Sequence, residues 1–269
     1  MLKKRVVTAV CLIPLAVAAV WFDQPVPWTT VFAAIWGLLA AREFYHAVGS
    51  ARPEAPPLTI LGMLWILLFI ISPHCDYLYV KPLLLASAAI VSLLWLWLRR
   101  RNDGIFFSWV WTLAGIIYIG WLLSQMVALR GLDYGRDWVL FALLVTFASD
   151  TSAFFVGSAI GKHLLAPSIS PKKTWEGAVG GVIGAAGIGL LMVMVLDLPI
   201  GYAYAAPLAV AASVFGQLGD LLESIFKRGM GLKDSGNSVP GHGGFLDRMD
   251  SVIFAGALVY CCAVAISGA

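Results

Sequence analysis

The feature that most constrains the fold is a succession of long apolar stretches along the whole chain of 269 residues. A helix that crosses a bilayer needs about 20 mostly apolar residues. Hydrophobic residues make up 60% of this sequence, against about 45–50% in soluble domains. We therefore expect an all-α integral membrane protein, a polytopic bundle of about nine transmembrane helices. The predicted spans are residues 6–22, 27–44, 57–73, 81–98, 108–129, 137–160, 177–196, 201–223 and 251–267.

Lysine and arginine are spread unevenly over the predicted loops. Short cytoplasmic loops of membrane proteins carry the excess of positive charge. With a cytoplasmic N-terminus, only Lys81, Arg130 and Arg136 of the 18 basic residues fall on the outer side. We therefore expect a cytoplasmic N-terminus, a C-terminus on the other side, and a place in the cytoplasmic (inner) membrane. The basic residues on the predicted cytoplasmic side are Lys3, Lys4, Arg5, Arg42, Arg52, Arg99, Arg100, Arg101, Lys162, Lys172, Lys173, Lys227, Arg228, Lys233 and Arg248.

The net charge of +3 and the pI near 8.7 do not indicate nucleic acid as a partner, because the basic residues lie in loops beside the membrane. Anionic lipid headgroups fit these loops better. The basic N-terminus with its apolar run is similar to a signal peptide, and Ala16-Val17-Ala18 is a weak cleavage site. We expect an uncleaved first span, because the apolar run continues to Phe22.

The four cysteines show no C-x-x-C spacing. Their pattern predicts neither a disulfide framework nor a zinc site, and we expect them to pack within the protein. They are Cys11, Cys75, Cys261 and Cys262.

Polar residues are distributed unevenly between the two halves of the chain. Residues 1–140, about five spans, contain almost nothing polar inside the apolar stretches and are predicted to be a scaffold. Residues 141–269 carry charged residues within spans and two polar cytoplasmic loops, 161–177 and 225–250. We therefore expect the catalytic region there.

Glycines recur through the predicted span from Gly177 to Gly189 and form two G-x-x-x-G pairs, Gly177 with Gly181 and Gly180 with Gly184. Such spacing lets a neighbouring helix approach closely. Packing within one chain is the favoured interpretation, and a subunit interface is the alternative.

Two aspartates, Asp150 and Asp220, lie well inside apolar stretches. An ionised group at bilayer depth costs about 2.5–3.5 kcal/mol, so such residues usually mark a functional site. The alternative is a structural carboxylate that is hydrogen-bonded within the bundle. Together with the polar loops, the two aspartates favour a functional site.

Asp220, Ser224 and Lys227 share one helical face because they are spaced i, i+4 and i+7. A carboxylate, a hydroxyl and an ammonium group on one face suit a hard cation such as Mg²⁺ and a phosphate. Asp247 and Asp250 form a second pair of carboxylates at i and i+3. Asp250 is alternatively the cap of the last span.

The segment between these carboxylates, residues 229–246, has six glycines in eighteen positions. Glycine-rich turns form anion-binding concavities from backbone N–H groups. The segment is not a Walker A loop, because G-x-x-x-x-G-K-[ST] is absent. Its flanking cations and carboxylates predict a polyphosphate held through metal. The cations are Lys227, Arg228, Lys233 and His242.

The loop at residues 168–177, SISPKKTWEG, carries two adjacent lysines, Lys172 and Lys173, suited to pairing with phosphate. Thr174 and Glu176 are predicted to cap the following helix. A cytoplasmic loop requires lysines in any case, so the two lysines alone leave both interpretations open.

Three runs of sequence resemble the CDP-diacylglycerol synthases, the phosphatidate cytidylyltransferase family. SIFKRGMGLKDSGNSVPGHGGFLDRMD looks like the family signature, and the other two runs lie at Ser149–His163 and Ser170–Gly177. The resemblance covers residues 149–251 and implies the reaction of CTP with phosphatidate to give CDP-diacylglycerol and pyrophosphate, on the cytoplasmic face. It also implies dependence on Mg²⁺, a second cation such as K⁺, and a homodimer.

The resemblance assigns roles to individual residues. It implies catalytic roles for Asp220, Asp247, Lys227, Arg228 and Asp250. It implies substrate binding by Ser170, Lys172, Lys173, Ser224, Lys233, His242, Gly243, Gly244 and Arg248. It implies metal binding by Asp150, Asp220, Asp247, Asp250 and Ser224. A general base is hardly required, because a phosphomonoester is already ionised near neutral pH.

Three alternatives remain from the sequence. A CTP-dependent polyprenol-type kinase and an ether-lipid cytidylyltransferase share the phosphate chemistry. A cation-coupled membrane transporter explains Asp150 and Asp220 but not the glycine-rich loop.

Overall fold

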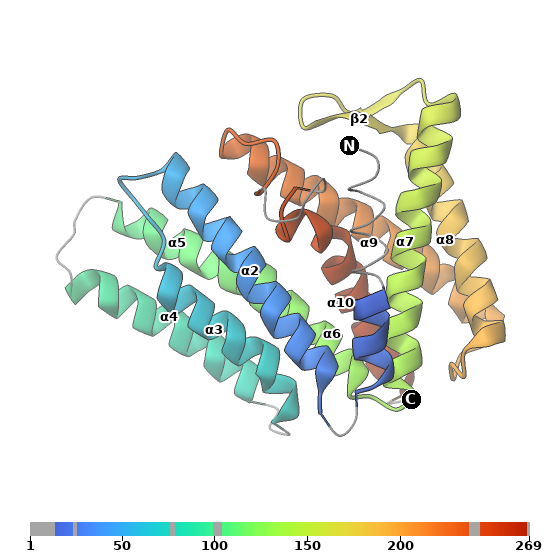
Figure 1. Ribbon diagram of the computed structural model, residues 1–269, viewed down its shortest axis with the longest axis horizontal. Coiled ribbons are helices and arrows are strands. Elements are labelled where there is room, and N and C mark those ends of the chain that lie inside the picture. Colours follow the sequence, from blue (N-terminus) through green and yellow to red (C-terminus); the bar gives the residue numbers. More distant parts are fainter. Residues whose placement is uncertain (1–13, 24–25, 76–78, 99–103, 237–242, 268–269) are drawn as a thin grey trace. The chain divides into compact units, whose positions relative to one another are not determined.

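The computed structural model describes residues 14–23, 26–75, 79–98, 104–236 and 243–267, and these are mostly helical (Figure 1). The chain divides into two compact units. The first, called the α2 unit, comprises Met1–Ala128 and Gly229–Asp247. The second, called the α7 unit, comprises Leu129–Arg228 and Arg248–Ala269.

The α2 unit is built from helices that are apolar over most of their length. Its α3 packs against α2 and against the π-helical turn η2. The elements are α2 (Trp28–Ala51), α3 (Thr59–Ile71), η1 (Ser72–His74), α4 (Val80–Leu98), α5 (Ile105–Gly115), η2 (Ile116–Trp121) and α6 (Leu122–Arg130), which runs on into the α7 unit.

Tyr45 of α2 joins three helices in the core of the α2 unit. Its hydroxyl donates a hydrogen bond to the Thr112 carbonyl of α5 at 2.9 Å. Its ring fills the space in front of Gly115, where a Cβ atom would lie 2.6 Å from Tyr45 Cε1, and it also contacts Gly62 of α3. The two glycines therefore allow the large ring to be buried.

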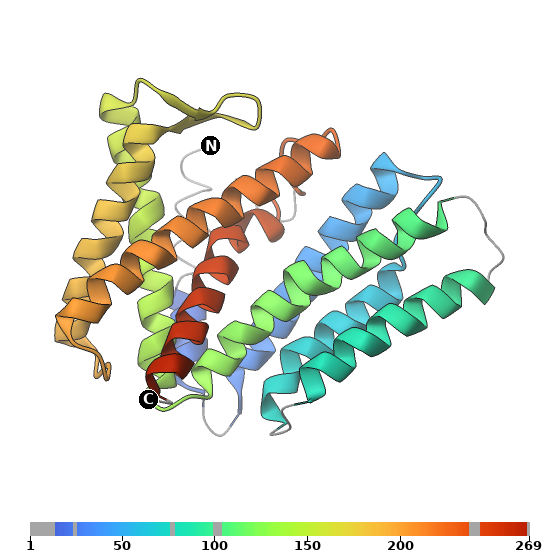
Figure 2. The same cartoon turned by 180° about the vertical axis from the view of Figure 1, so that it is seen from behind.

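The α7 unit contains three long helices, a hairpin and the last helix. Figures 1 and 2 show α7 and α8 side by side with the hairpin at one end. The elements are α7 (Gly135–Ile160), β1 (Leu164–Ala166), β2 (Ser170–Thr174), α8 (Trp175–Val195), α9 (Tyr202–Gly229), η3 (Leu246–Arg248), which begins in the α2 unit, and α10 (Asp250–Ser267).

The glycines of α8 pack against α7 of the same chain. A Cβ atom on Gly180 would lie 2.6 Å from Val156 Cβ, and one on Gly181 would lie 3.0 Å from the Ser149 carbonyl oxygen. A Cβ atom on Gly184 would lie 2.5 Å from Ser152 Cβ. Packing within the chain is thus confirmed for these glycines, whereas a subunit interface stays a prediction.

Polar side chains link α9 to both α7 and α8. The hydroxyls of Ser149 and Ser213 are 2.7 Å apart and buried. Gln217 Nε2 donates to the Ala178 carbonyl at 3.1 Å. Because a buried polar group without a partner is costly, these bonds favour one rotation of α9 about its axis.

Helices occur in each predicted span that the structure describes. In this part of the chain, five helices are long and apolar enough to cross a membrane: Val80–Leu98, Ile105–Arg130, Gly135–Ile160, Trp175–Val195 and Tyr202–Gly229. Thr59–His74 and Asp250–Ile266 are shorter apolar helices. The membrane-protein class is therefore supported, while the count of nine spans and the orientation stay predictions. Residues 3–5 and 99–101, with much of the first span, lie outside the described residues.

The expectation for the cysteines is wrong at two positions. Cys75 and Cys261 are exposed free thiols, because one follows the η1 turn and the other lies on the exposed side of α10. Cys262 is half-buried, and Cys11 lies outside the described residues.

Replacing Gly180 with alanine is expected to destabilise the α7 unit, because overpacking a close contact costs about 1–3 kcal/mol. Gly187→Ala is a matched control on the same helix, since nothing lies within 4 Å of its added Cβ. Thermal unfolding in detergent should show a lower midpoint for Gly180→Ala than for Gly187→Ala. Equal midpoints would contradict the packing described here.

Candidate active site

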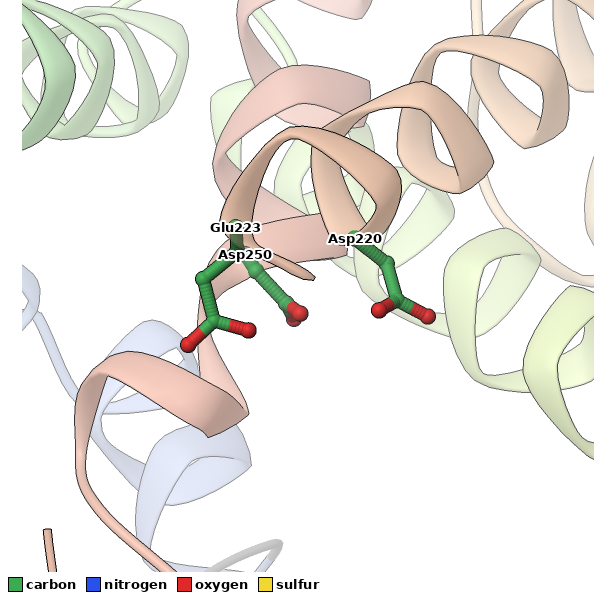
Figure 3. Close-up of side chains that lie close together, drawn as sticks. All are labelled: Asp220, Glu223 and Asp250. Carbon is green, nitrogen blue, oxygen red and sulfur yellow. The ribbon is translucent and has the colours of Figure 1, made fainter. Parts of the chain in front are cut away.

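Helices α9 and α10 bring three carboxylates together within the α7 unit. Asp220 and Glu223 lie one turn apart on α9, and Asp250 is the first residue of α10. Each offers an oxygen within 4.8 Å of the others (Figure 3). Glu223 and Asp250 are buried, whereas the Asp220 side chain is 33% exposed. We call these three residues the acidic cluster.

Small residues on α9 allow α10 to begin beside the acidic cluster. A Cβ atom on Gly219 would lie 2.5 Å from the Asp250 carbonyl oxygen and 2.6 Å from the Phe254 ring. One on Gly216 would lie 3.3 Å from the Ser251 carbonyl oxygen. The glycines therefore bring the backbone of α10 within reach of Asp220 and Glu223.

Two lysines pair with the acidic cluster. Lys173 Nζ lies 2.5 Å from Asp220 Oδ2, and Lys227 Nζ lies 2.6 Å from Glu223 Oε2. Closely spaced carboxylate oxygens suit a hard cation such as Mg²⁺.

Lys173 reaches the cluster from the hairpin β1–β2. Leu164 pairs with Thr174 and Ala166 pairs with Ser170 in antiparallel register. Arg228 Nε, at the end of α9, donates to the Ile169 carbonyl at 3.2 Å. Lys172 is exposed beside Lys173. The hairpin was not predicted from the sequence, which indicated only a polar loop.

The hairpin is joined to α8 through a helix cap. The Thr174 hydroxyl accepts a hydrogen bond from Gly177 N at 3.1 Å, which confirms its predicted cap. Glu176 instead turns back to the chain before the hairpin, where it pairs with His163 Nδ1 at 2.6 Å and accepts from Lys162 N at 3.1 Å. Glu176 therefore closes the base of the hairpin, which the sequence analysis did not foresee.

Asp150 and Ser224 lie near the acidic cluster without belonging to it. Asp150, on α7, is exposed and within electrostatic range of Asp220, Lys173 and Arg248. Ser224 lies half-buried on α9 next to Glu223. Metal binding by either residue stays a prediction.

Asp247 belongs to the α2 unit, where it binds two described parts of the glycine-rich segment, at Ser235 and at Gly244. Its Oδ2 accepts hydrogen bonds from Ser235 N at 3.0 Å, Ser235 Oγ at 2.9 Å and Gly244 N at 2.7 Å. Gly243 has a left-handed φ of +83°, and a Cβ atom there would lie 2.5 Å from the same oxygen. The left-handed backbone and the closeness of the carboxylate each require glycine at position 243.

The remaining predicted substrate-binding residues are dispersed. Lys233 is exposed in the α2 unit, and Arg248 is exposed in the α7 unit. Ser170 lies half-buried in β2. His242 lies outside the described residues.

Sequence analysis overlooked two buried carboxylates, Glu223 and Glu43. Glu223 was detectable, because it lies one helical turn from Asp220 in the same apolar stretch. Glu43 lies in α2, and its Oε2 accepts from Leu246 N at 3.1 Å. Nothing local in the sequence indicates a contact over 203 residues.

Comparison with known proteins identifies the family. The model of the cytidylyltransferase family matches residues 3–266. A phosphatidate cytidylyltransferase of Bacillus subtilis is 34% identical over 263 residues, 96% of each chain. One from Brucella abortus is 34% identical over 96% of this chain and 92% of its own. Phosphatidate cytidylyltransferase 5 of Arabidopsis thaliana, a chloroplast protein, is 38% identical over 86% of this chain and 64% of its own. A match over nearly the whole length means that this chain belongs to the cytidylyltransferase family.

Proposed function

We propose that this protein transfers the cytidylyl group of CTP to phosphatidate and produces CDP-diacylglycerol and pyrophosphate. Relatives that match nearly the whole chain are named for that activity. The observation that carries the proposal is the acidic cluster with its two lysines, Lys173 and Lys227. Carboxylates and ammonium groups together suit a polyphosphate that binds with a cation.

The reaction joins two anions. A phosphate oxygen of phosphatidate attacks the α-phosphorus of CTP and forms a P–O–P bond, while the bond from the α-phosphorus to the bridging oxygen breaks and pyrophosphate leaves. Positioning of the two reactants and neutralisation of their negative charge therefore contribute most to lowering the barrier. An ionised phosphomonoester needs little help from a base.

Asp220, Glu223 and Asp250 would hold Mg²⁺, since their oxygens lie within 4.8 Å of one another. Bound there, the ion would supply positive charge that offsets charge on the phosphate oxygens. The sequence also predicts cation binding by Asp150, Ser224 and Asp247 and a second cation such as K⁺, and these stay predictions.

The basic residues near the acidic cluster differ in how far their side chains are buried. Lys227 pairs with a fully buried Glu223 side chain, so it first serves to neutralise that carboxylate. Lys173 is 26% exposed, and Lys172 and Arg228 are exposed beside it on the hairpin and at the end of α9. We assign these three to pairing with the phosphates of CTP and phosphatidate.

The placement of positive charge supports a site on the cytoplasmic side of the inner membrane, where CTP is available. The proposed homodimer rests on the family resemblance alone.

Purified protein in detergent is expected to transfer label from α-³²P-CTP into lipid when phosphatidate and Mg²⁺ are present. In a parallel assay with γ-³²P-CTP, transfer of label into lipid would identify a CTP-dependent lipid kinase and refute the proposal. Preference for an unsaturated ether-lipid phosphate over phosphatidate would favour the ether-lipid alternative. Chelation with EDTA should abolish incorporation, and added Mg²⁺ should restore it.

Asp220→Asn and Glu223→Gln are each expected to lower turnover by at least about 100-fold, since loss of even an outer-shell partner of a metal ligand costs about 10–100-fold. Asp197→Asn is the matched control, because Asp197 is exposed in the turn after α8. Initial rates at saturating Mg²⁺ measure the effect. Near-normal rates in both cluster variants would exclude the acidic cluster as the metal site.

Replacing Lys227 or Lys173 with methionine is expected to affect stability and turnover to different degrees. Lys227→Met removes the cation from a buried carboxylate, which costs about 3–5 kcal/mol of stability. Lys173→Met should retain more stability, because Asp220 is 33% exposed, and should lose mainly turnover. Thermal midpoints and initial rates for both variants test this order, and a larger loss of stability in Lys173→Met would refute it.

A further inference from the structure

Glu43 is a buried carboxylate in the middle of α2, with 8% of its surface exposed. Its Oε2 accepts hydrogen bonds from Leu246 N at 3.1 Å and Ser235 Oγ at 3.2 Å. A buried carboxylate is costly unless it is hydrogen-bonded. These two bonds tie α2 to both sides of the glycine-rich segment within the α2 unit.

Ser235 connects Glu43 to Asp247. The Ser235 hydroxyl lies 3.2 Å from Glu43 Oε2 and 2.9 Å from Asp247 Oδ2. A hydroxyl has one proton, so it donates to only one of these oxygens at a time. Leu246, which donates to Glu43, directly precedes Asp247 in the chain. Glu43 is therefore linked to Asp247 in two ways, through the Ser235 side chain and through the backbone of Leu246.

Gly236 and Gly244 lie close to the Glu43 side chain. A Cβ atom on Gly236 would lie 2.7 Å from Glu43 Oε1, and one on Gly244 would collide with Glu43 Oε2 and the Ser235 hydroxyl. Close contact with Glu43 thus explains glycine at positions 236 and 244.

A second residue of α2 supports the same segment. Trp36 Nε1 donates to the Phe245 carbonyl at 3.1 Å. The two rings meet edge to face with centroids 5.0 Å apart. Trp36 and Glu43 lie seven residues apart, so they share one face of α2.

We propose that Glu43 is a positioning residue for the cytidylyl transfer, and this inference rests on the proposed function. It holds Ser235 and Leu246 in place and so orients Asp247 and the backbone at Gly244 before CTP binds. Preorganisation of a binding segment lowers the entropy lost on binding. Polar partners that orient a ligand-binding carboxylate typically affect binding or activity by about 10–100-fold.

Hydrogen–deuterium exchange on the full-length protein without CTP tests the contact directly. Glu43→Ala should speed exchange in the peptide that contains Leu246. Glu43→Gln keeps an oxygen that accepts from Leu246 N, so its exchange should stay closer to that of the unmodified protein. Glu54→Gln is the matched control, because Glu54 is exposed beyond the end of α2.

Kinetics should separate positioning from folding. Glu43→Ala should lower kcat/KM for CTP about 10–100-fold, with Glu43→Gln less affected. Ser235→Ala, which removes the shared hydroxyl and keeps Glu43, should show the same direction of change. KM for phosphatidate should stay unchanged in all three.

Unchanged exchange at Leu246 in Glu43→Ala would overturn the inference. Faster exchange throughout α3–α5 with equal losses for both substrates would also overturn it, because Glu43 would then serve folding alone. If the unmodified protein fails to form CDP-diacylglycerol, the proposed function fails, and the role of Glu43 in cytidylyl transfer fails with it. Exchange at Leu246 still decides whether Glu43 holds the segment.

Discussion

Carboxylates buried in apolar helices are the constraint on which the rest of the structure depends. A charged group at bilayer depth costs about 2.5–3.5 kcal/mol, and α9 and α10 together bury Glu223 and Asp250. Lys227 compensates Glu223 directly, and Lys173 compensates Asp220 from the hairpin. Close contact of α9 with α10 at Gly219 makes the arrangement possible. The close packing at Gly219 and the two lysine pairs therefore act together to allow carboxylates between these helices.

The α2 unit meets the same constraint with backbone groups in place of lysines. Glu43 accepts from Leu246 N, and Asp247 accepts from Ser235 N and Gly244 N. Backbone donors satisfy a carboxylate without adding a charge that must itself be compensated. Glycine is needed at positions 243 and 244, because a Cβ atom there would collide with Asp247 Oδ2 or with Glu43 Oε2. The glycine-rich segment thus has a structural explanation besides anion binding.

Local patterns in the sequence predicted the helices well, because each span is a continuous apolar run. They also placed Asp220 and Asp250 in one site, where the structure joins them. The hairpin was missed because Pro171 and two lysines are typical of a loop, and a two-stranded pairing is decided by contacts outside it. Glu43 was missed because its partners lie about two hundred residues away. Local pattern predicts elements, whereas pairing between distant residues is set by tertiary packing.

The Glu223–Lys227 pair has a consequence for how the ion pairs of the site form. Its members are spaced i, i+4 on one helix, so the pair forms as soon as α9 is helical. Asp220 must wait for Lys173, which lies 47 residues earlier, beyond α8. On the isolated helix α9, one acidic side chain is therefore already paired and the other is not. Pairing of Asp220 requires the hairpin to pack against α9, so the second ion pair of the site forms only with tertiary packing of the α7 unit.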